Sequence, residues 1–126
     1  MLFTITEIQT ENDIIYVSGS TITGHLKGVW KYRDFPIKDK SYNIELDFST
    51  IDRKSVTISK PPVSIKITGD KVKFTALCEN IDEIYYLRFL PDGLSMLDIT
   101  NDDFKISKGD FISFSKCFHE IEIYPY

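Results

Sequence analysis

The chain has 126 residues, of which 42% are hydrophobic and 27% are charged, with a net charge of -4 at pH 7. This composition predicts one globular domain over residues 1–126 and excludes a disordered chain. A mildly acidic chain does not favour nucleic acid or a membrane as a partner, because both attract basic surfaces. Aromatic residues reach 13% and Ala76 is the only alanine, so strands are favoured over helices.

Neither a secretory signal nor a membrane span is indicated. The N-terminus has no basic start followed by an apolar core, and no apolar run approaches the roughly 20 residues that span a bilayer. We therefore expect a cytoplasmic protein. Cys78 and Cys117 are expected to be reduced thiols in that compartment, although the sequence leaves a bridge between them open.

The first half of the chain indicates strands separated by short loops. Polarity that alternates with period two predicts strands at residues 3–10, 14–20 and 43–49. The segment 21–33 is predicted to be one extended stretch that Gly24 and a second glycine bend. The loop that follows contains a proline, which has no N–H for a ladder hydrogen bond and so excludes a central strand there.

The stretch 63–100 is the best specified and predicts a meander of four strands. Residues 69–70 suit a two-residue type II′ hairpin turn, with glycine first. This turn places apolar residues opposite apolar residues on one face, and Lys66 opposite Lys73 on the other face. A slip of one residue would destroy both matches, so the register is well determined.

Two further turns complete the meander. We predict a four-residue loop at 80–83, which places Ala76 opposite Leu87, and a three-residue turn at 91–93. Further strands follow residue 103. The apolar alternation changes phase near 117–120, where we predict a β-bulge.

The fold class follows from the number and spacing of these segments. About 8–10 short strands, with turn signals every 8–12 residues, predict an all-β antiparallel sandwich or flattened barrel with a central meander at 63–100. No segment carries an apolar stripe of period 3.6 long enough to predict a helix.

The sequence does not support an enzyme. It has no nucleophile elbow, no phosphate-binding glycine loop and no zinc-binding H-E-x-x-H motif. His25 and His119 could serve with a lysine in acid–base cleavage of RNA, but two unrelated surface histidines are the favoured interpretation. Cys78 and Cys117 do not have metal-ligand spacing with each other or with the histidines, so no metal or cofactor is expected. Cys117 and His119 alternate on one face and are a weak candidate for a thiolate pair.

Charge is unevenly distributed along the chain. Residues 79–103 carry seven acids and one base, whereas residues 53–73 carry six bases and one acid. Two charge runs that neighbour each other in the sheet are the simpler interpretation. The functional interpretation is an acidic surface with tyrosine and methionine, which suits docking of a basic protein. The predicted partner-binding residues are Glu79, Asp82, Glu83, Tyr86, Arg88, Met96, Asp98, Asp102 and Asp103.

A second aromatic cluster lies earlier in the chain. Trp30, Tyr32 and Phe35 are close in sequence to Lys31 and Arg33. Aromatic residues interleaved with bases can stack single-stranded nucleic acid on a small barrel. Core side chains at alternating positions are the favoured interpretation of the same pattern.

The chain length, the strand–PDG–strand sequence YYLRFLPDGLSMLDIT and the acid-rich turns are shared with a known class of proteins. In these features the chain resembles the small, acidic, all-β immunity proteins of bacterial toxin systems, such as contact-dependent growth inhibition. The resemblance implies a cytoplasmic inhibitor without catalysis that occludes the active site of a toxin domain, often a nuclease. The sequence says little about the oligomeric state, for which a monomer is favoured. The alternatives are a barrel that holds a small apolar ligand and a barrel that binds single-stranded nucleic acid.

Overall fold

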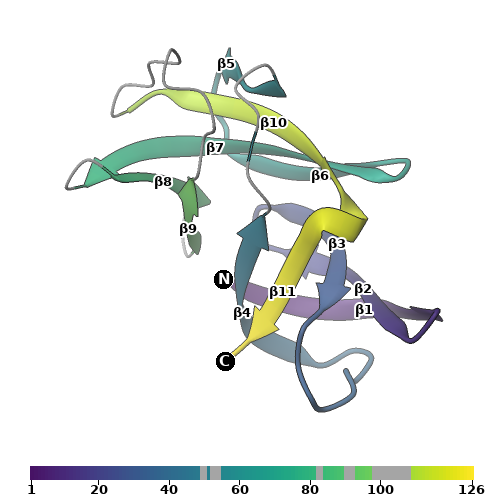
Figure 1. Cartoon of the computed structure of the whole chain (residues 1–126). Coiled ribbons are helices and arrows are strands. Elements are labelled where there is room, and N and C mark those ends of the chain that lie inside the picture. The colour runs from purple at the N-terminus through teal and green to yellow at the C-terminus, as the bar shows by residue number, and fades with distance from the viewer. Residues whose placement is uncertain (49–50, 52–54, 82–83, 90–92, 98–108) are drawn as a thin grey trace.

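A computed structural model describes residues 1–48, 51, 55–81, 84–89, 93–97 and 109–126 (Figure 1). The described part is mostly strand, which confirms the all-β prediction, and contains eleven strands and the short 3₁₀ helix η2. The elements are β1 (Leu2–Glu11), β2 (Ile14–Thr21), β3 (Gly24–Trp30), β4 (Ser41–Phe48), β5 (Thr57–Ser59), β6 (Ser64–Thr68), β7 (Lys71–Ile81), β8 (Ile84–Phe89), β9 (Gly93–Leu97), β10 (Phe111–Cys117), η2 (Phe118–Glu120) and β11 (Ile121–Pro125).

Five strands close into a small barrel. β1, β2 and β3 form an antiparallel meander, and β4 returns to pair with the other edge of β1, which is the Greek-key order. β11 pairs antiparallel with β4 and parallel with β3, so the ring β1–β2–β3–β11–β4 is complete. Closure gives each of these strands two neighbours in the ring, although β4 pairs with β1 over Leu2–Thr4 only.

The turn between β2 and β3 differs from the sequence prediction. Residues 21–33 do not form one bent strand, because the chain reverses at Ile22 and Thr23. The Thr21 hydroxyl oxygen accepts hydrogen bonds from the backbone N–H groups of Thr23 and Gly24, at 3.1 Å each. A serine or threonine side chain can stabilise a turn in this way, and the signal is easily missed when an isoleucine occupies the turn.

A second sheet is built around the long strand β7 (Figure 1). β6 and β8 follow one another along one edge of β7, β10 lies on the other edge, and β5 lies outside β10. The predicted β6–β7 register is confirmed, with Lys66 opposite Lys73. Gly69 has φ +63° in the hairpin turn, the conformation for which glycine was expected there.

The later registers of the meander shift by two residues from the prediction. Ile81 faces Ile84, so the connection has two residues and Cys78, not Ala76, faces Leu87. A shift of two residues leaves every side chain on its original face, so the apolar pattern could not distinguish the two registers. Gly93 pairs with β8 and begins β9 instead of closing the turn.

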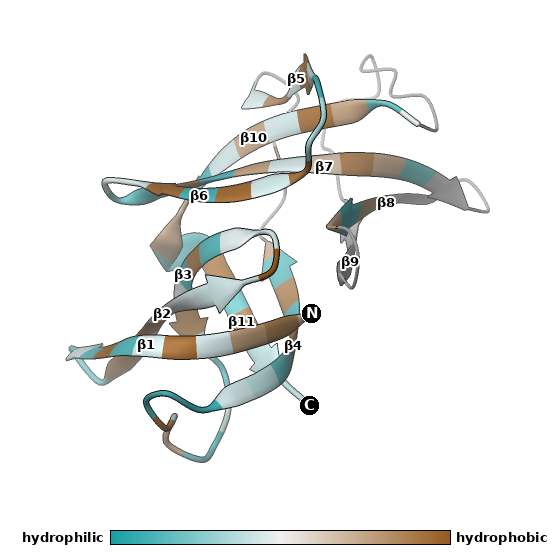
Figure 2. Cartoon of the chain, turned by 180° about the vertical axis from the view of Figure 1, so that it is seen from behind, coloured by the Kyte–Doolittle hydropathy of each residue, from teal (hydrophilic) through white to brown (hydrophobic). Residues whose placement is uncertain are grey.

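The barrel and the second sheet share one core. A single cluster of buried apolar side chains runs through both, and Figure 2 shows apolar and polar residues alternating along the strands. The Phe48 ring from β4 lies 5.0 Å from the Phe74 ring of β7 and 5.6 Å from the Phe114 ring of β10, between ring centroids. β3 and β6 meet at Gly24, where an added Cβ would collide with the carbonyl oxygen of Ile65.

The predicted bulge near residues 117–120 is wrong. The phase change is the 3₁₀ helix η2, through which the chain passes from β10 in the second sheet to β11 in the barrel. This passage buries Ile121 and Ile123 in the barrel. Among the described residues, no helix has the length and apolar character needed to cross a membrane.

Candidate functional site

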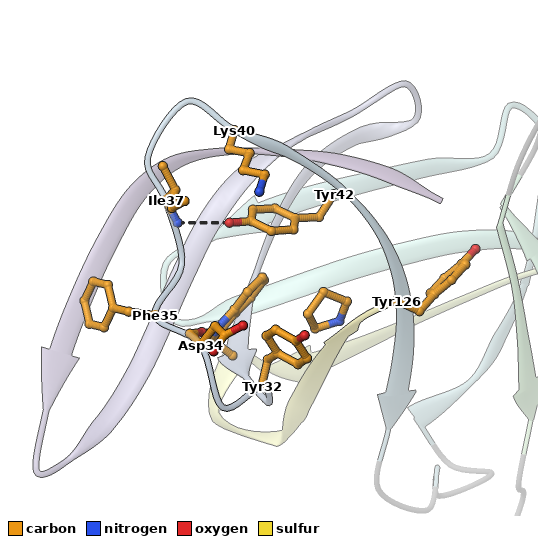
Figure 3. Close-up of a pocket in the computed structure, with 9 residues that line it drawn as sticks. Tyr32, Asp34, Phe35, Ile37, Lys40, Tyr42 and Tyr126 are labelled. Atoms are coloured by element: carbon orange, nitrogen blue, oxygen red, sulfur yellow. Dashed lines mark hydrogen bonds between the residues drawn. The ribbon is translucent and has the colours of Figure 1, made fainter.

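An aromatic depression lies at one end of the barrel, beside the loop that joins β3 to β4 (Figure 3). It has a volume of about 300 Å³. We call it the aromatic surface. Its members are Trp30, Tyr32, Asp34, Phe35, Ile37, Lys40, Tyr42, Pro125 and Tyr126.

The loop that carries most of this surface is held by its own hydrogen bonds. The Trp30 indole N–H donates to the backbone carbonyl of Asp34 at 2.9 Å. The backbone N–H of Ile37 donates to the Tyr42 hydroxyl at 3.2 Å, as drawn in Figure 3. The backbone N–H of Asp39 donates to the carbonyl of Ile5 on β1 at 2.7 Å. The loop is therefore attached to the barrel at both ends, and its side chains are presented in a defined arrangement.

The rings divide into a buried base and an exposed rim. Trp30 is only 5% exposed, and its ring centroid lies 5.0 Å from that of Tyr42. Phe35 is 60% exposed, Ile37 55% and Tyr126 75%. Large apolar side chains gathered at the surface, over a rigid base, are typical of sites that bind other molecules.

The burial of Trp30 agrees with the favoured interpretation, a core side chain, and argues against the alternative in which this ring stacks on nucleic acid. A ring that is 5% exposed cannot stack on a base, and its only N–H donor is occupied by Asp34. Lys31 forms an ion pair with Glu122 at 3.4 Å. Lys40, not Lys31, approaches an aromatic ring here, with its Nζ 5.0 Å from the centroid of Tyr42.

The predicted acidic surface is described only in part. Glu79, Tyr86 and Arg88 lie on the outer face of β7 and β8, and Met96 on β9 is the register partner of Tyr86. Asp82, Glu83, Asp98, Asp102 and Asp103 lie outside the described residues.

Glu79 and Arg88 satisfy each other. The Arg88 guanidinium donates two hydrogen bonds to the Glu79 carboxylate, Nε to Oε1 at 2.8 Å and Nη2 to Oε2 at 3.0 Å. The hydrogen bond with Glu79 raises the pKa of Arg88. The described centre of the predicted surface is therefore a neutral ion pair and contributes little net negative charge.

The two cysteines have different environments. Cys78 is fully buried on β7, and this burial, followed by the nearby Asp110 and Glu79 carboxylates, raises the pKa of its thiol to about 11. Cys117 is half-buried, with Sγ 3.0 Å from Nδ1 of His119. The histidine ring stacks on Phe118, with centroids 4.1 Å apart. The described residues include no group of three or more His, Cys, Asp or Glu placed to hold a metal ion.

Sequence reasoning missed several members of the aromatic surface. Trp30, Tyr32 and Phe35 were noticed as neighbours in sequence, but Tyr126 was not connected with them. The parallel pairing of Ile123 with Trp30 brings the C-terminus to this end of the barrel. That pairing joins residues 93 positions apart, and nothing local to either segment indicates it. Comparisons with protein-family models, with curated proteins and with solved structures found no match to this chain.

Proposed function

We propose that the protein is a non-catalytic inhibitor that binds a protein partner through the aromatic surface. The observation that carries this proposal is the exposed rim of Tyr32, Phe35, Ile37 and Tyr126 around a preorganised depression. Tyrosine, tryptophan and other aromatic anchors supply much of the binding energy at protein interfaces. Because the loop is already fixed, little conformational entropy is lost when a partner binds.

The proposed partner is a bacterial toxin domain, such as a nuclease, and the proposed compartment is the cytoplasm. The support is the resemblance in length, fold class and acid-rich turns to immunity proteins. The acidic run 79–103 would speed the encounter with a basic toxin, while the aromatic surface would supply most of the affinity. A small apolar ligand is the second candidate, because an aromatic depression of about 300 Å³ matches the lower end of small-molecule sites.

A rescue experiment tests the proposal. The proposed partner, a toxin domain, is expressed together with the wild-type protein, Phe35→Ser or Tyr126→Ala. Both changes are at exposed positions, so folding should be retained. We expect the wild-type protein to protect the cell and both variants to lose protection. Ile22→Ser is the matched control, because Ile22 is a 74% exposed apolar residue on the β2–β3 turn, outside the aromatic surface.

The possible outcomes separate the candidates. If both aromatic variants protect as well as the wild-type protein, the aromatic surface is not the inhibitory interface. In that case charge reversal at Asp98 and Asp102 tests whether the acidic run holds the partner instead. A thermal shift produced by fatty acids or similar ligands, and abolished by Phe35→Ser, would favour the apolar-ligand function.

A further inference from the structure

Three exposed lysines lie on the outer face of the second sheet. Lys66 on β6 is directly opposite Lys73 on β7, and Lys71 is two residues before Lys73 on the same face. All three are exposed, and none forms an ion pair within the described part of the chain. Like charges directly opposite one another disfavour strand pairing, so this arrangement works against the hairpin that contains it.

Hydroxyl groups accompany these lysines. Lys71 and Lys73 line a groove of about 210 Å³ together with hydroxyl-bearing side chains from β5 and β10. Thr57 and Ser115 are exposed there. Lys66 lines a second groove, of about 570 Å³, whose other charged or titratable lining residues are His25 and Lys27 of β3 and Glu7 of β1. We call Thr57, Lys66, Lys71, Lys73 and Ser115 the lysine face.

The spacing of the lysines favours an extended anion over a small one. Residues two apart on a strand are separated by about 7 Å, and cross-strand partners by about 5 Å. The points at which the three lysine side chains leave the backbone are thus spread over the sheet surface at intervals of about 5–7 Å. A chain of regularly spaced anions can contact all three together.

The combination of donors favours phosphate over carboxylate as the repeated anion. Lysine ammonium groups and serine or threonine hydroxyls are the side chains that commonly contact the phosphates of nucleic acids. Among the described residues that line the groove of Lys71 and Lys73, Phe114 is the only aromatic one, and it is 2% exposed. In that groove bases would have no exposed ring to stack on, so contacts there would involve the backbone, while the exposed His25 imidazole lines the separate groove of Lys66.

We propose that the lysine face binds the phosphate backbone of single-stranded nucleic acid without reading its sequence. A single strand is flexible enough to follow a sheet surface. The charge is local, because the chain as a whole carries -4. This binding activity is independent of the proposed inhibition. The lysine face lies on the second sheet, whereas the aromatic surface lies on the barrel, and the two share no residue.

The number of lysines predicts how strongly the affinity for single-stranded nucleic acid depends on salt. Neutralising three phosphates of a single strand predicts a slope of about -2 in log affinity against log salt. Affinity should therefore rise about tenfold when the salt falls from about 150 mM to about 50 mM. At physiological salt the dissociation constant should lie in the range of about 10⁻⁴ to 10⁻⁶ M that is usual for non-specific binding.

Fluorescence anisotropy with a labelled oligothymidylate tests the proposal, using the full chain. We expect Lys66→Gln combined with Lys73→Gln to weaken binding at least tenfold at low salt and to reduce the slope by about 1.4. The matched control is Arg33→Gln combined with Lys38→Gln, which removes the same charge from an exposed loop. This control should bind as the wild-type protein does.

Three results would overturn the proposal. One is the absence of binding by the wild-type protein at about 50 mM salt. Another is an equal loss in the control variant, which would mean that overall charge alone governs the interaction. The third is competition by polyglutamate as strong as that by oligothymidylate of equal charge, which would assign the face to an acidic protein. Thermal melting of both variants confirms that they are folded.

Discussion

Replacement of Phe74 by alanine should destabilise the barrel as well as the second sheet that contains Phe74. The Phe74 side chain is fully buried. Its ring stacks on Phe114, with centroids 5.3 Å apart, and meets the edge of Phe48 from the barrel at 5.0 Å. It therefore lies where the two halves of the molecule share their core.

The loss of unfolding free energy expected in Phe74→Ala follows from the burial of this side chain. A buried phenylalanine replaced by alanine costs about 3–5 kcal/mol, through lost transfer free energy and the cavity that remains. For 126 residues the unfolding entropy is about 0.26 kcal/mol/K, from about 2.1 cal/mol/K per residue. A loss of about 4 kcal/mol then lowers Tm by about 15 °C. Phe35→Ala, at a 60% exposed position, should change stability by less than about 0.5 kcal/mol.

Urea unfolding followed by two probes measures the effect. Trp30 is the only tryptophan and lies in the barrel, so its fluorescence reports on that half, while far-UV circular dichroism reports on all strands. We expect both midpoints to fall together in Phe74→Ala. If the Trp30 transition stays at its wild-type midpoint while the dichroism midpoint falls, the two halves unfold separately and the shared core is refuted.

Two further predictions follow from single positions. Gly24→Ala should destabilise the protein by at least about 2 kcal/mol, because the new Cβ would overlap the Ile65 carbonyl oxygen, whereas Gly69→Ala should cost about 1 kcal/mol for its positive φ alone. The free energy of unfolding should also fall between about pH 9 and pH 11. In the folded state the Cys78 thiol keeps its proton up to about pH 11, whereas in the unfolded state it loses its proton from about pH 9, so rising pH favours the unfolded state in this range. The slope should reach about 1.4 kcal/mol per pH unit and should vanish in Cys78→Ala.

Chemical denaturation of these variants gives the decisive results. Equal losses of unfolding free energy in Gly24→Ala and Gly69→Ala would contradict the close approach of β3 to β6. A pH dependence above pH 9 that persists unchanged in Cys78→Ala would assign the effect to other groups, such as lysine and tyrosine side chains.

The sequence predicted those features of the fold that depend on nearby residues. The β6–β7 register was correct because a glycine turn and period-two polarity specify it independently. The β7–β8 register was wrong by two residues because both registers bury the same side chains. The β2–β3 turn was missed because the Thr21 hydroxyl, not a glycine or proline, organises it.

Closure of the barrel could not be predicted from local patterns. It depends on the chain leaving β10 of the second sheet through η2, after which β11 pairs with β3 and β4. These pairings join distant parts of the chain. The aromatic surface depends on the same event, because Pro125 and Tyr126 join its lining only when β11 lies beside β3. The acidic residues were selected by their charge, but charge alone does not reveal that Glu79 is neutralised by Arg88.

The affinity of the purified protein for the proposed partner, a toxin domain, tests the central claim most directly. Truncation of a central aromatic anchor at an interface costs at least about 2 kcal/mol, which corresponds to about 30-fold in the dissociation constant. We predict that Phe35→Ser weakens binding by at least this factor, while Ile22→Ser leaves the dissociation constant within about threefold of the wild-type value. Equal affinities for the wild-type protein and Phe35→Ser would contradict the assignment of the aromatic surface as the binding site.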